Sequence, residues 1–144
     1  MRERTLLMVK PDGVARGLEK EIFKRVEKAG LKVLLKKQLL MTREAAADLY
    51  APHHGKKFYP GLVNFITSGP VICSAVQGEN AIERVRELMG ATDPREADAG
   101  TIRGDLREKE VTNSEGTIKN LVHGSDSPAS AAKEIAIFFK PDEI

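Results

Sequence analysis

Segments typical of strands and segments typical of helices alternate along most of this chain, and no other feature of the sequence limits the fold as strongly. Short apolar or alternating runs predict strands at residues 4–9, 31–40 and 71–77. Apolar residues at helical spacing predict helices at residues 17–29, 43–51, 60–67 and 79–89. Strands separated by helices fit a sandwich in which helices cover a sheet, although the pattern leaves parallel and antiparallel pairing open.

The pattern weakens in the last third of the chain. Residues 91–119 are rich in Pro, Gly, Asp, Asn and Ser, and a loop of this length is often functional. The apolar step at 121–122 is too short to assign to an element. Ser127 and Pro128 predict the N-cap and the first residue of a helix of about two turns. Residues 135–139 then predict a final strand.

Composition limits the class of protein. With 144 residues, the chain has room for one domain over residues 1–144 and little room for a second. Its 23 basic and 21 acidic residues give a net charge of +2, which favours neither nucleic acid nor a membrane as partner. The one cysteine, Cys73, cannot form an internal disulfide and suits a buried thiol in a reducing compartment. The first ten residues do not read as a signal peptide, so we expect a cytoplasmic protein.

The segment at residues 120–127 places His123 between a short apolar step and a cluster of small polar residues. Imidazole is the only side chain whose unperturbed pKa lies near neutrality, so a histidine can act as a nucleophile without a metal. On a turn beside the start of a helix, it would face substrate phosphates. From this segment alone, an ordinary turn that leads into a helix is the favoured interpretation.

Four other positions could bind an anionic substrate, and each has a plainer interpretation. Lys10 lies at a strand exit, where a solvated lysine is equally plausible. Arg86 comes one residue after Val85 and could emerge beside the buried face of its predicted helix, but it could also be a surface arginine. Thr92 could donate its hydroxyl or cap a turn. Arg103 is flanked by glycines that permit close approach of the backbone, although a simple Arg103–Asp105 contact is the alternative.

Several site types find little support. The chain has neither a P-loop nor the protein-kinase signature set. His53 and His54 are adjacent without a third nearby ligand, which is poor spacing for zinc, so we expect loop residues there. Phe58 and its aromatic neighbour Tyr59 suit core packing in general and base stacking as the sharper hypothesis.

A set of motifs connects these positions. They are ERTL and VKPDGV within residues 3–14, FYPGL at 58–62, SGPV at 68–71, MGATDP at 89–94, GTIRGD at 100–105 and NLVHGSDS at 120–127. In this order they are highly specific, and along essentially its whole length the chain resembles a nucleoside diphosphate kinase.

The resemblance implies a ferredoxin-like α/β (α+β) sandwich, with a four-stranded antiparallel sheet covered by helices. It also implies transfer of a γ-phosphoryl group from a nucleoside triphosphate to a nucleoside diphosphate. The residues matched to catalytic positions are His123 as the phosphorylated histidine, Glu134, Lys10, Tyr50 and Ser125. The residues matched to nucleotide contacts are Lys10, Phe58, Arg86, Thr92, Arg103 and Asn120.

Cofactor and partners follow from the same resemblance. We expect Mg²⁺ bound mainly through the nucleotide phosphates, with no metal ligand assigned to the protein. We expect a homo-oligomer, with a hexamer favoured over a tetramer. Stacking on Phe58 would not depend on base identity, and none of the matched residues reads a base edge, so we expect broad base tolerance. The mechanism we expect is ping-pong transfer through His123.

The chain departs from the family pattern at two places, and two other classes of protein remain as alternatives. Ala99 stands where the family usually has proline, and residues 106–119 form a longer connection than usual, expected to be a surface loop. A binding module that only keeps the fold would not need the matched site. A histidine phosphocarrier that serves proteins would not need Phe58, Thr92, Arg103 and Asn120 together.

Overall fold

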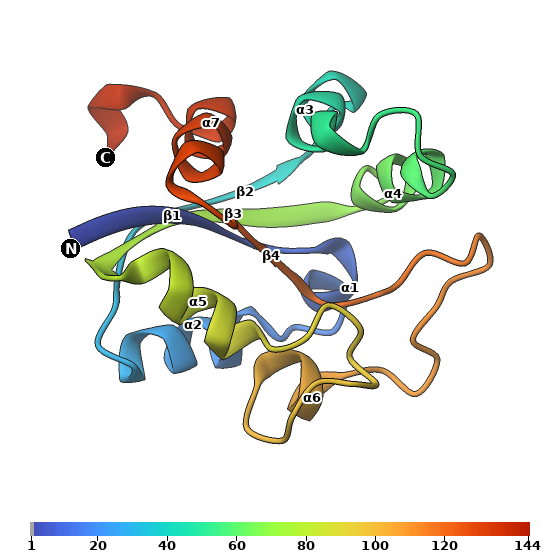
Figure 1. Ribbon diagram of the computed structural model, residues 1–144, viewed down its shortest axis with the longest axis horizontal. Helices are drawn as coiled ribbons and strands as arrows, with labels where there is room; N and C mark the ends of the chain where they lie inside the picture. Colours follow the sequence, from blue (N-terminus) through green and yellow to red (C-terminus); the bar gives the residue numbers. More distant parts are fainter. Residues whose placement is uncertain (1) are drawn as a thin grey trace.

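The computed structural model describes residues 2–144, which are organised around a four-stranded sheet (Figure 1). The strands are β1 (Arg2–Val9), β2 (Lys32–Leu40), β3 (Pro70–Glu79) and β4 (Val122–Gly124). They lie in the order β2-β3-β1-β4, and every neighbouring pair is antiparallel. The expected four-stranded antiparallel sheet is therefore confirmed.

Helices cover both faces of the sheet. They are α1 (Pro11–Ala15), α2 (Glu19–Lys28), α3 (Arg43–Leu49), α4 (Tyr59–Ile66), α5 (Ala81–Met89), α6 (Ile102–Leu106) and α7 (Pro128–Phe138), with short 3-10 helices η1 (Ala51–His53) and η2 (Pro141–Glu143). In Figure 1, α3, α4 and α7 lie above the sheet, and α2, α5 and α6 lie below it. No helix within residues 2–144 is long and apolar enough to cross a bilayer.

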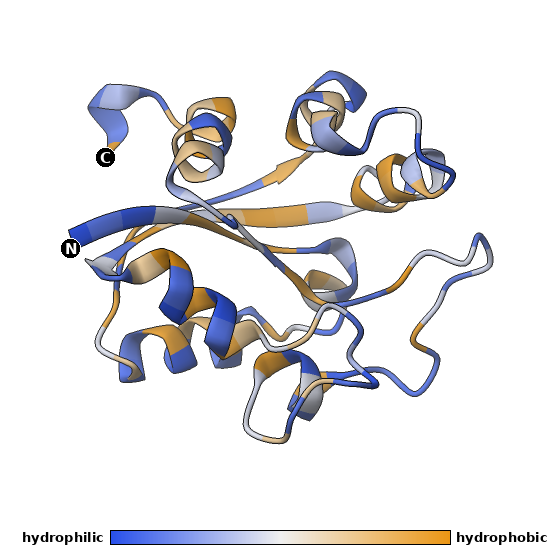
Figure 2. Ribbon diagram, viewed as in Figure 1, coloured by the Kyte–Doolittle hydropathy of each residue, from blue (hydrophilic) through white to orange (hydrophobic). Residues whose placement is uncertain are grey.

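The central strand β1 separates two hydrophobic clusters. Successive side chains of a strand point to opposite faces. Leu7 and Val9 therefore join the cluster that contains residues of α2 and α5, whereas Leu6 and Met8 join the cluster under α3, α4 and α7. All four side chains are fully buried. The apolar sides of the helices turn toward the sheet in Figure 2, so β1 is fixed from both faces.

Sequence signals at the helix ends are confirmed. The Thr42 and Ser127 hydroxyls accept hydrogen bonds from the backbone N–H groups of Ala45 and Ser130, and so cap α3 and α7. Gly90 ends α5 with a φ of +86°, a conformation that favours glycine. Cys73 is fully buried in β3, as predicted.

The prediction for the end of the chain is wrong. Residues 135–139 do not form a strand, because the helix that begins after Ser127 continues to Phe138. Ile135 and Phe138 lie in the cluster above the sheet, so burial on one helical face outweighs the strand preference of this β-branched and aromatic run. The fourth strand is instead β4, the short segment that the sequence left unassigned.

Two short helices were also missed. Pro11 was interpreted as the stop of β1, but it is also the first residue of α1, a position that suits proline. The predicted loop at 91–119 contains α6 and, after it, a hairpin-like turn with an isolated bridge between Thr112 and Ile118. In Figure 1 this segment extends from α6 toward α4.

Candidate active site

A cleft of about 1200 Å³ opens beside the ends of β1 and β4. Eight of the ten predicted site residues line it, namely Lys10, Tyr50, Phe58, Arg86, Thr92, Arg103, Asn120 and His123. The other two, Ser125 and Glu134, are buried. The fold therefore brings together side chains that lie more than a hundred residues apart in the sequence.

His123 is held on β4 opposite Met8 of β1, and its side chain is 20% exposed. Its Nε2 atom lies 2.9 Å from Oε1 of Glu134 on α7. A carboxylate can only accept a hydrogen bond, so Nε2 carries the hydrogen and Nδ1 keeps a lone pair. The contact with Glu134 thereby selects the tautomer in which Nδ1 is the nucleophilic atom.

Ser125 fixes the carboxylate that orients the histidine. Its hydroxyl donates to the same Oε1 atom of Glu134 at 2.8 Å and accepts the backbone N–H of Leu6 at 3.3 Å. Ser125 is 1% exposed and Glu134 is 9% exposed. The Glu134 side chain projects from α7 and its carboxylate is hydrogen-bonded to His123 on β4 and to Ser125 just after it. These bonds restrict the rotation of both the carboxylate and the His123 ring.

The Lys10 ammonium is buried at the exit of β1, where it donates to Oδ1 of Asn120 at 2.8 Å. Burial, followed by repulsion from the nearby Arg103, lowers the pKa of Lys10 to about 8, and Asp12 opposes the shift. Lys10 is therefore no solvated surface lysine. A buried cation that lines a cleft is well placed to bind an anion.

Arg103 connects three segments of the site. Its guanidinium donates to the backbone oxygens of Asn120 at 3.0 Å, Gly90 at 3.1 Å and Val122 at 2.7 Å. Burial, followed by repulsion from Arg86, lowers its pKa to about 10. The alternative of a simple Arg103–Asp105 contact is wrong, since Asp105 pairs with Arg25 at 2.9 Å and Arg103 bonds these carbonyls.

The amide of Asn120 links the cations to the cleft wall. Its Nδ2 donates to the backbone oxygen of Thr92 at 3.0 Å, while its Oδ1 accepts from Lys10. Asn120 is 6% exposed. Thr92, Asn120 and Lys10 therefore form one connected group on the wall that faces the cleft.

Leu121 adopts a backbone conformation that non-glycine residues seldom occupy. Its φ is +70°, and the N–H of Val122 donates to the oxygen of Asn120 at 2.7 Å across it. A hydrogen bond from residue i+2 to residue i around a positive φ is a γ-turn of the rare and strained kind. Strain of this kind persists only where neighbouring contacts enforce it, and it gathers at functional sites.

Tyr50 contributes a buried hydroxyl. Its ring meets that of His123 edge to face, with ring centroids 6.1 Å apart. Within the described chain its hydroxyl has no hydrogen-bond partner, although Tyr50 lines the cleft. Burial and the nearby Glu134 raise the pKa of Tyr50, so its hydroxyl stays protonated and remains a donor.

Phe58 stands at the mouth of the cleft with 53% of its surface exposed, which excludes a role in core packing.

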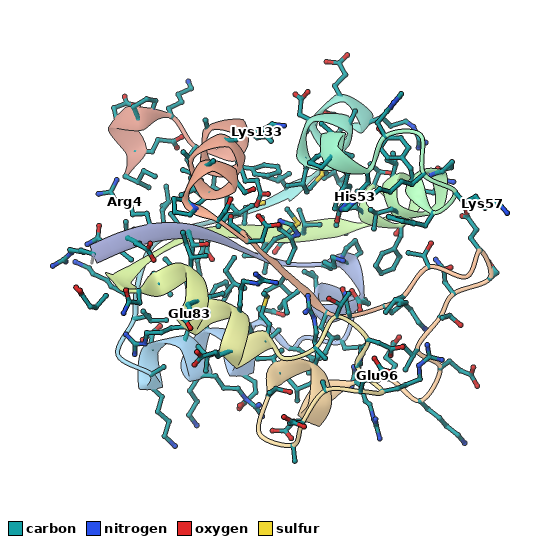
Figure 3. All side chains as sticks on the ribbon, in the orientation of Figure 1. Arg4, His53, Lys57, Glu83, Glu96 and Lys133 are labelled. Carbon is teal, nitrogen blue, oxygen red and sulfur yellow. The ribbon has the colours of Figure 1, made fainter. Side chains whose placement is uncertain are left out.

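The sequence did not predict that some neighbours of Phe58 would line the cleft. His53 lies 5.3 Å from the Phe58 ring and lines the cleft, as do Thr117 and Ile118 from the turn that follows α6. In Figure 3 Lys57 projects outward, whereas His53 lies on the inner side of the same connection.

These missed residues carried little local signal. His53 and His54 were interpreted as loop residues because no third metal ligand stood nearby. The turn at 112–118 reaches the cleft through contacts that the sequence does not encode locally, such as Asn64 Nδ2 to Glu115 Oε2 at 3.0 Å. The only hint was the length of the unpatterned segment.

Comparison with known proteins decides the family. Residues 3–144 match the family described as nucleoside diphosphate kinase. The nucleoside diphosphate kinase of Archaeoglobus fulgidus is 51% identical over 142 residues, which cover 99% of this chain and 89% of that protein. The chain belongs to the nucleoside diphosphate kinase family.

Solved structures of nucleoside diphosphate kinases share the fold. The Halobacterium salinarum protein, in complex with CDP, is 48% identical with a TM-score of 0.89, over 99% of this chain and 91% of that one. The Borrelia burgdorferi protein, in a transition-state mimic with vanadate and ADP, is 39% identical with a TM-score of 0.91, over 99% and 90%. The ferredoxin-like α/β fold is thus confirmed, and the chain is an enzyme of phosphoryl transfer between nucleotides.

Proposed function

We propose that the enzyme moves a γ-phosphoryl group from a nucleoside triphosphate to a nucleoside diphosphate through a phosphohistidine at His123. The observation that carries this proposal is the pairing of His123 Nε2 with Glu134 at 2.9 Å, at the wall of a cleft that contains buried cations. This pairing leaves Nδ1 as the nucleophile. The transition-state mimic of the Borrelia relative, with vanadate and ADP, supports the same class of reaction.

The chemistry runs in two halves at one site. Nδ1 of His123 attacks the γ-phosphorus in line while the bond to the bridging oxygen breaks, and the bond's electron pair leaves on the β-phosphate of the diphosphate product. Glu134 stabilises the positive charge that develops on the imidazole through Nε2–H. The first diphosphate departs, a second one enters, and the reaction runs in reverse onto it.

Phosphate oxygens are the ligands that the cleft fits best. Lys10 and Arg86 supply cations, and Arg103 adds charge while it holds the backbone of Asn120. The unpartnered Tyr50 hydroxyl is a donor for an oxygen near His123. We assign Thr92 and Asn120 to the same phosphate and sugar contacts, because they complete that wall.

A nucleotide-bound Mg²⁺ fits this donor set. Within residues 2–144, no group of three or more His, Cys, Asp or Glu side chains is placed to hold a metal ion. The side chains of Lys10, Arg86, Arg103 and Asn120 offer ammonium, guanidinium and amide donors to the cleft, and such donors suit phosphate oxygens. A Mg²⁺ with ligands from phosphates and water matches this arrangement, and when bound it offsets charge on the transferring group.

Base tolerance follows from Phe58 and Ile118, which line the cleft and carry no hydrogen-bonding side-chain group. Stacking contributes about 1–3 kcal/mol whichever base is present. The relatives' complexes with CDP and ADP, one pyrimidine and one purine, are in keeping with this. A preference of roughly 10⁴-fold for one base would contradict it, since such discrimination requires buried groups that read the base edge.

One experiment tests the phosphohistidine. The protein is incubated with ATP and Mg²⁺, and its intact mass is measured for one added phosphoryl group, which GDP should then remove. The same treatment of His123→Ala should add no phosphoryl group. An acid-labile phosphoenzyme that forms normally in His123→Ala would show that another residue is the nucleophile.

We also propose that the chain acts as one domain over residues 1–144, assembles with copies of itself and works in the cytoplasm. The edge strand β2 supports self-assembly, because it ends the sheet and carries Leu40 with 67% of its surface exposed. The resemblance favours a hexamer over a tetramer, and sedimentation equilibrium distinguishes them. The lone buried thiol of Cys73 suits a reducing compartment.

A further inference from the structure

A buried carboxylate that the phosphoryl-transfer scheme does not use lies beneath the cleft. It belongs to Asp12 in the first turn of α1, with 7% of its surface exposed. We propose that Asp12 is a positioning residue for the reaction, which holds the Leu121 turn against β1 and adds a negative charge to the buried cations of the site. This inference rests on the proposed function, because it concerns how the nucleotide site is kept in its working form.

The first part of the proposal is geometric. Oδ2 of Asp12 accepts the backbone N–H of Leu121 at 2.9 Å. Leu121 is the strained residue of the γ-turn, and it lies between Asn120, the partner of Lys10, and His123. The contact with Asp12 satisfies a buried N–H that the turn leaves outside the sheet, and so offsets the strain.

The neighbours of Asp12 complete this clamp. The backbone N–H of Lys10 donates to the Leu121 oxygen at 2.8 Å, so residues 10 and 12 satisfy both backbone groups of Leu121. A Cβ on Gly13 would lie 2.8 Å from Val9 Cγ1 and 3.1 Å from the Leu121 oxygen. Close contact between α1 and the turn therefore requires glycine there, and the segment KPDG acts as one unit.

The second part is electrostatic. The ionisable groups that face one another here are Lys10, Asp12, Tyr50 and Arg103, with Arg86 beyond Arg103 and Glu134 beyond Tyr50. Arg103 lowers the pKa of Lys10 and Arg86 lowers that of Arg103, whereas Asp12 raises the pKa of both Lys10 and Arg103. Burial raises the pKa of Asp12 itself, while Lys10 and the Leu121 N–H favour its ionised form.

The two carboxylate oxygens of Asp12 differ in their hydrogen bonds, which helps to distinguish its structural role from its electrostatic role. Oδ2 makes the contact with Leu121, but Oδ1 is buried and has no hydrogen-bond partner within the described residues. An amide at this position could accept the same N–H bond. The hydrogen bond alone therefore does not require a carboxylate, but the neighbouring cations do.

Two substitutions distinguish the roles. Asp12→Asn keeps an acceptor for Leu121 and removes the charge, whereas Asp12→Ala removes both. For Asp12→Asn we expect the alkaline limb of the kcat/KM profile to move down by about 1 pH unit, because an opposite charge nearby shifts a pKa by about that much or more. For Asp12→Ala we expect kcat to fall at every pH as well. Asp48→Asn, the same change at an exposed position on α3, should match wild type.

A third variant keeps the test decisive if removal of the charge prevents folding. Asp12→Glu keeps the charge but displaces Leu121, so its alkaline limb should stay near that of wild type while kcat falls. The proposal is overturned if Asp12→Asn reproduces the wild-type profile, or if the limb of Asp12→Glu moves down as well. Wild type that forms no phosphohistidine in the mass assay would instead overturn the proposed function.

Discussion

At the scale of single residues, one oxygen atom of Glu134 carries much of the proposed chemistry. It accepts from both His123 Nε2 and Ser125 Oγ, so a single carboxylate sets the tautomer and the ring orientation. The charge of that carboxylate, beyond its ability to accept a hydrogen bond, is what stabilises the imidazole during attack.

Glu134→Gln therefore separates charge from geometry. The amide oxygen still accepts from His123, but a hydrogen bond to a charged group, worth about 1.5–3 kcal/mol, is weakened, which predicts a roughly 10- to 150-fold fall in kcat. The KM for nucleotide should change little, because Glu134 does not line the cleft. Steady-state kinetics with ATP and a second diphosphate give both constants. An unchanged kcat would show that orientation by any acceptor is sufficient.

The lowered pKa of Lys10 predicts that both the stability of the fold and the binding of phosphate depend on pH. Its pKa in the folded chain is about 8, below the ordinary value of 10.5. Between these values the unfolded chain binds more protons than the folded chain, so this group makes the free energy of unfolding rise as pH increases. Phosphate binding should weaken over the same range, because the ammonium loses its charge.

Lys10→Met isolates that contribution. Cys73, whose pKa burial raises to about 12, acts in the opposite direction at alkaline pH, so the informative quantity is the difference between wild type and variant. Chemical unfolding without nucleotide should show this difference growing in favour of wild type from about pH 8 upward. A difference that is constant with pH would mean that Lys10 titrates normally.

At the scale of elements, α7 links local capping to the site. The Ser127 hydroxyl caps the helix that carries Glu134 two turns later, so the cap helps to place the carboxylate behind His123. Ser127→Ala should cost about 1 kcal/mol of stability, measured by urea unfolding. Thr42→Ala, which removes the equivalent cap of α3, is the matched comparison for stability. Equal stability of Ser127→Ala and wild type would contradict the capping role.

Several elements that the sequence predicted well are long enough to show a period, although α7, which is longer than α2, was partly predicted as a strand. Strands β1 and β3 and helices α2 and α5 bury one face or both over eight residues or more, and their pattern is visible locally. Strand β4 has three residues and gains its conformation from pairing with β1, which no local pattern records. Helix α6 depends on its Thr101 cap, whose hydroxyl accepts from Gly104 N at 3.0 Å.

The residues of the candidate site also fall into two groups, those that the sequence could predict and those that it could not. Its motif residues could be predicted because their order along the chain matches a known family. The turn at Leu121 and the cleft-lining positions of His53 and Ile118 could not, because they depend on contacts between distant segments. The Asp12–Leu121 contact, for example, spans 109 residues.

At the scale of the whole molecule, the cleft draws its walls from both sides of the sheet. Tyr50 and Phe58 come from above it, Arg86 and Arg103 from below, and His123 from the sheet itself. A ligand in this cleft therefore contacts both hydrophobic halves of the molecule. Its binding should stabilise the entire fold against unfolding.

Nucleotide should thus raise the melting temperature in a concentration-dependent way. At 100 times Kd, linkage predicts about 2.7 kcal/mol, which corresponds to a rise of roughly 5–10 °C for a chain of this size. Thermal scans with ADP and Mg²⁺ measure the rise. His123→Ala should keep it, since the phosphate contacts remain, whereas Lys10→Met should lose most of it. Equal rises in wild type and Lys10→Met would argue against phosphate binding by Lys10.

The pairing of β1 with β4 also has a consequence for synthesis. Strand β4 follows β1 by more than a hundred residues along the chain, although Met8 pairs with His123 in the sheet, so a ribosome releases β1 well before β4. Until β4 emerges, β1 presents a free edge of N–H and C=O groups, and such edges promote association between chains. The same delay means that the proposed nucleophile, His123, reaches its place beside Met8 only after the residues between these two strands have been synthesised.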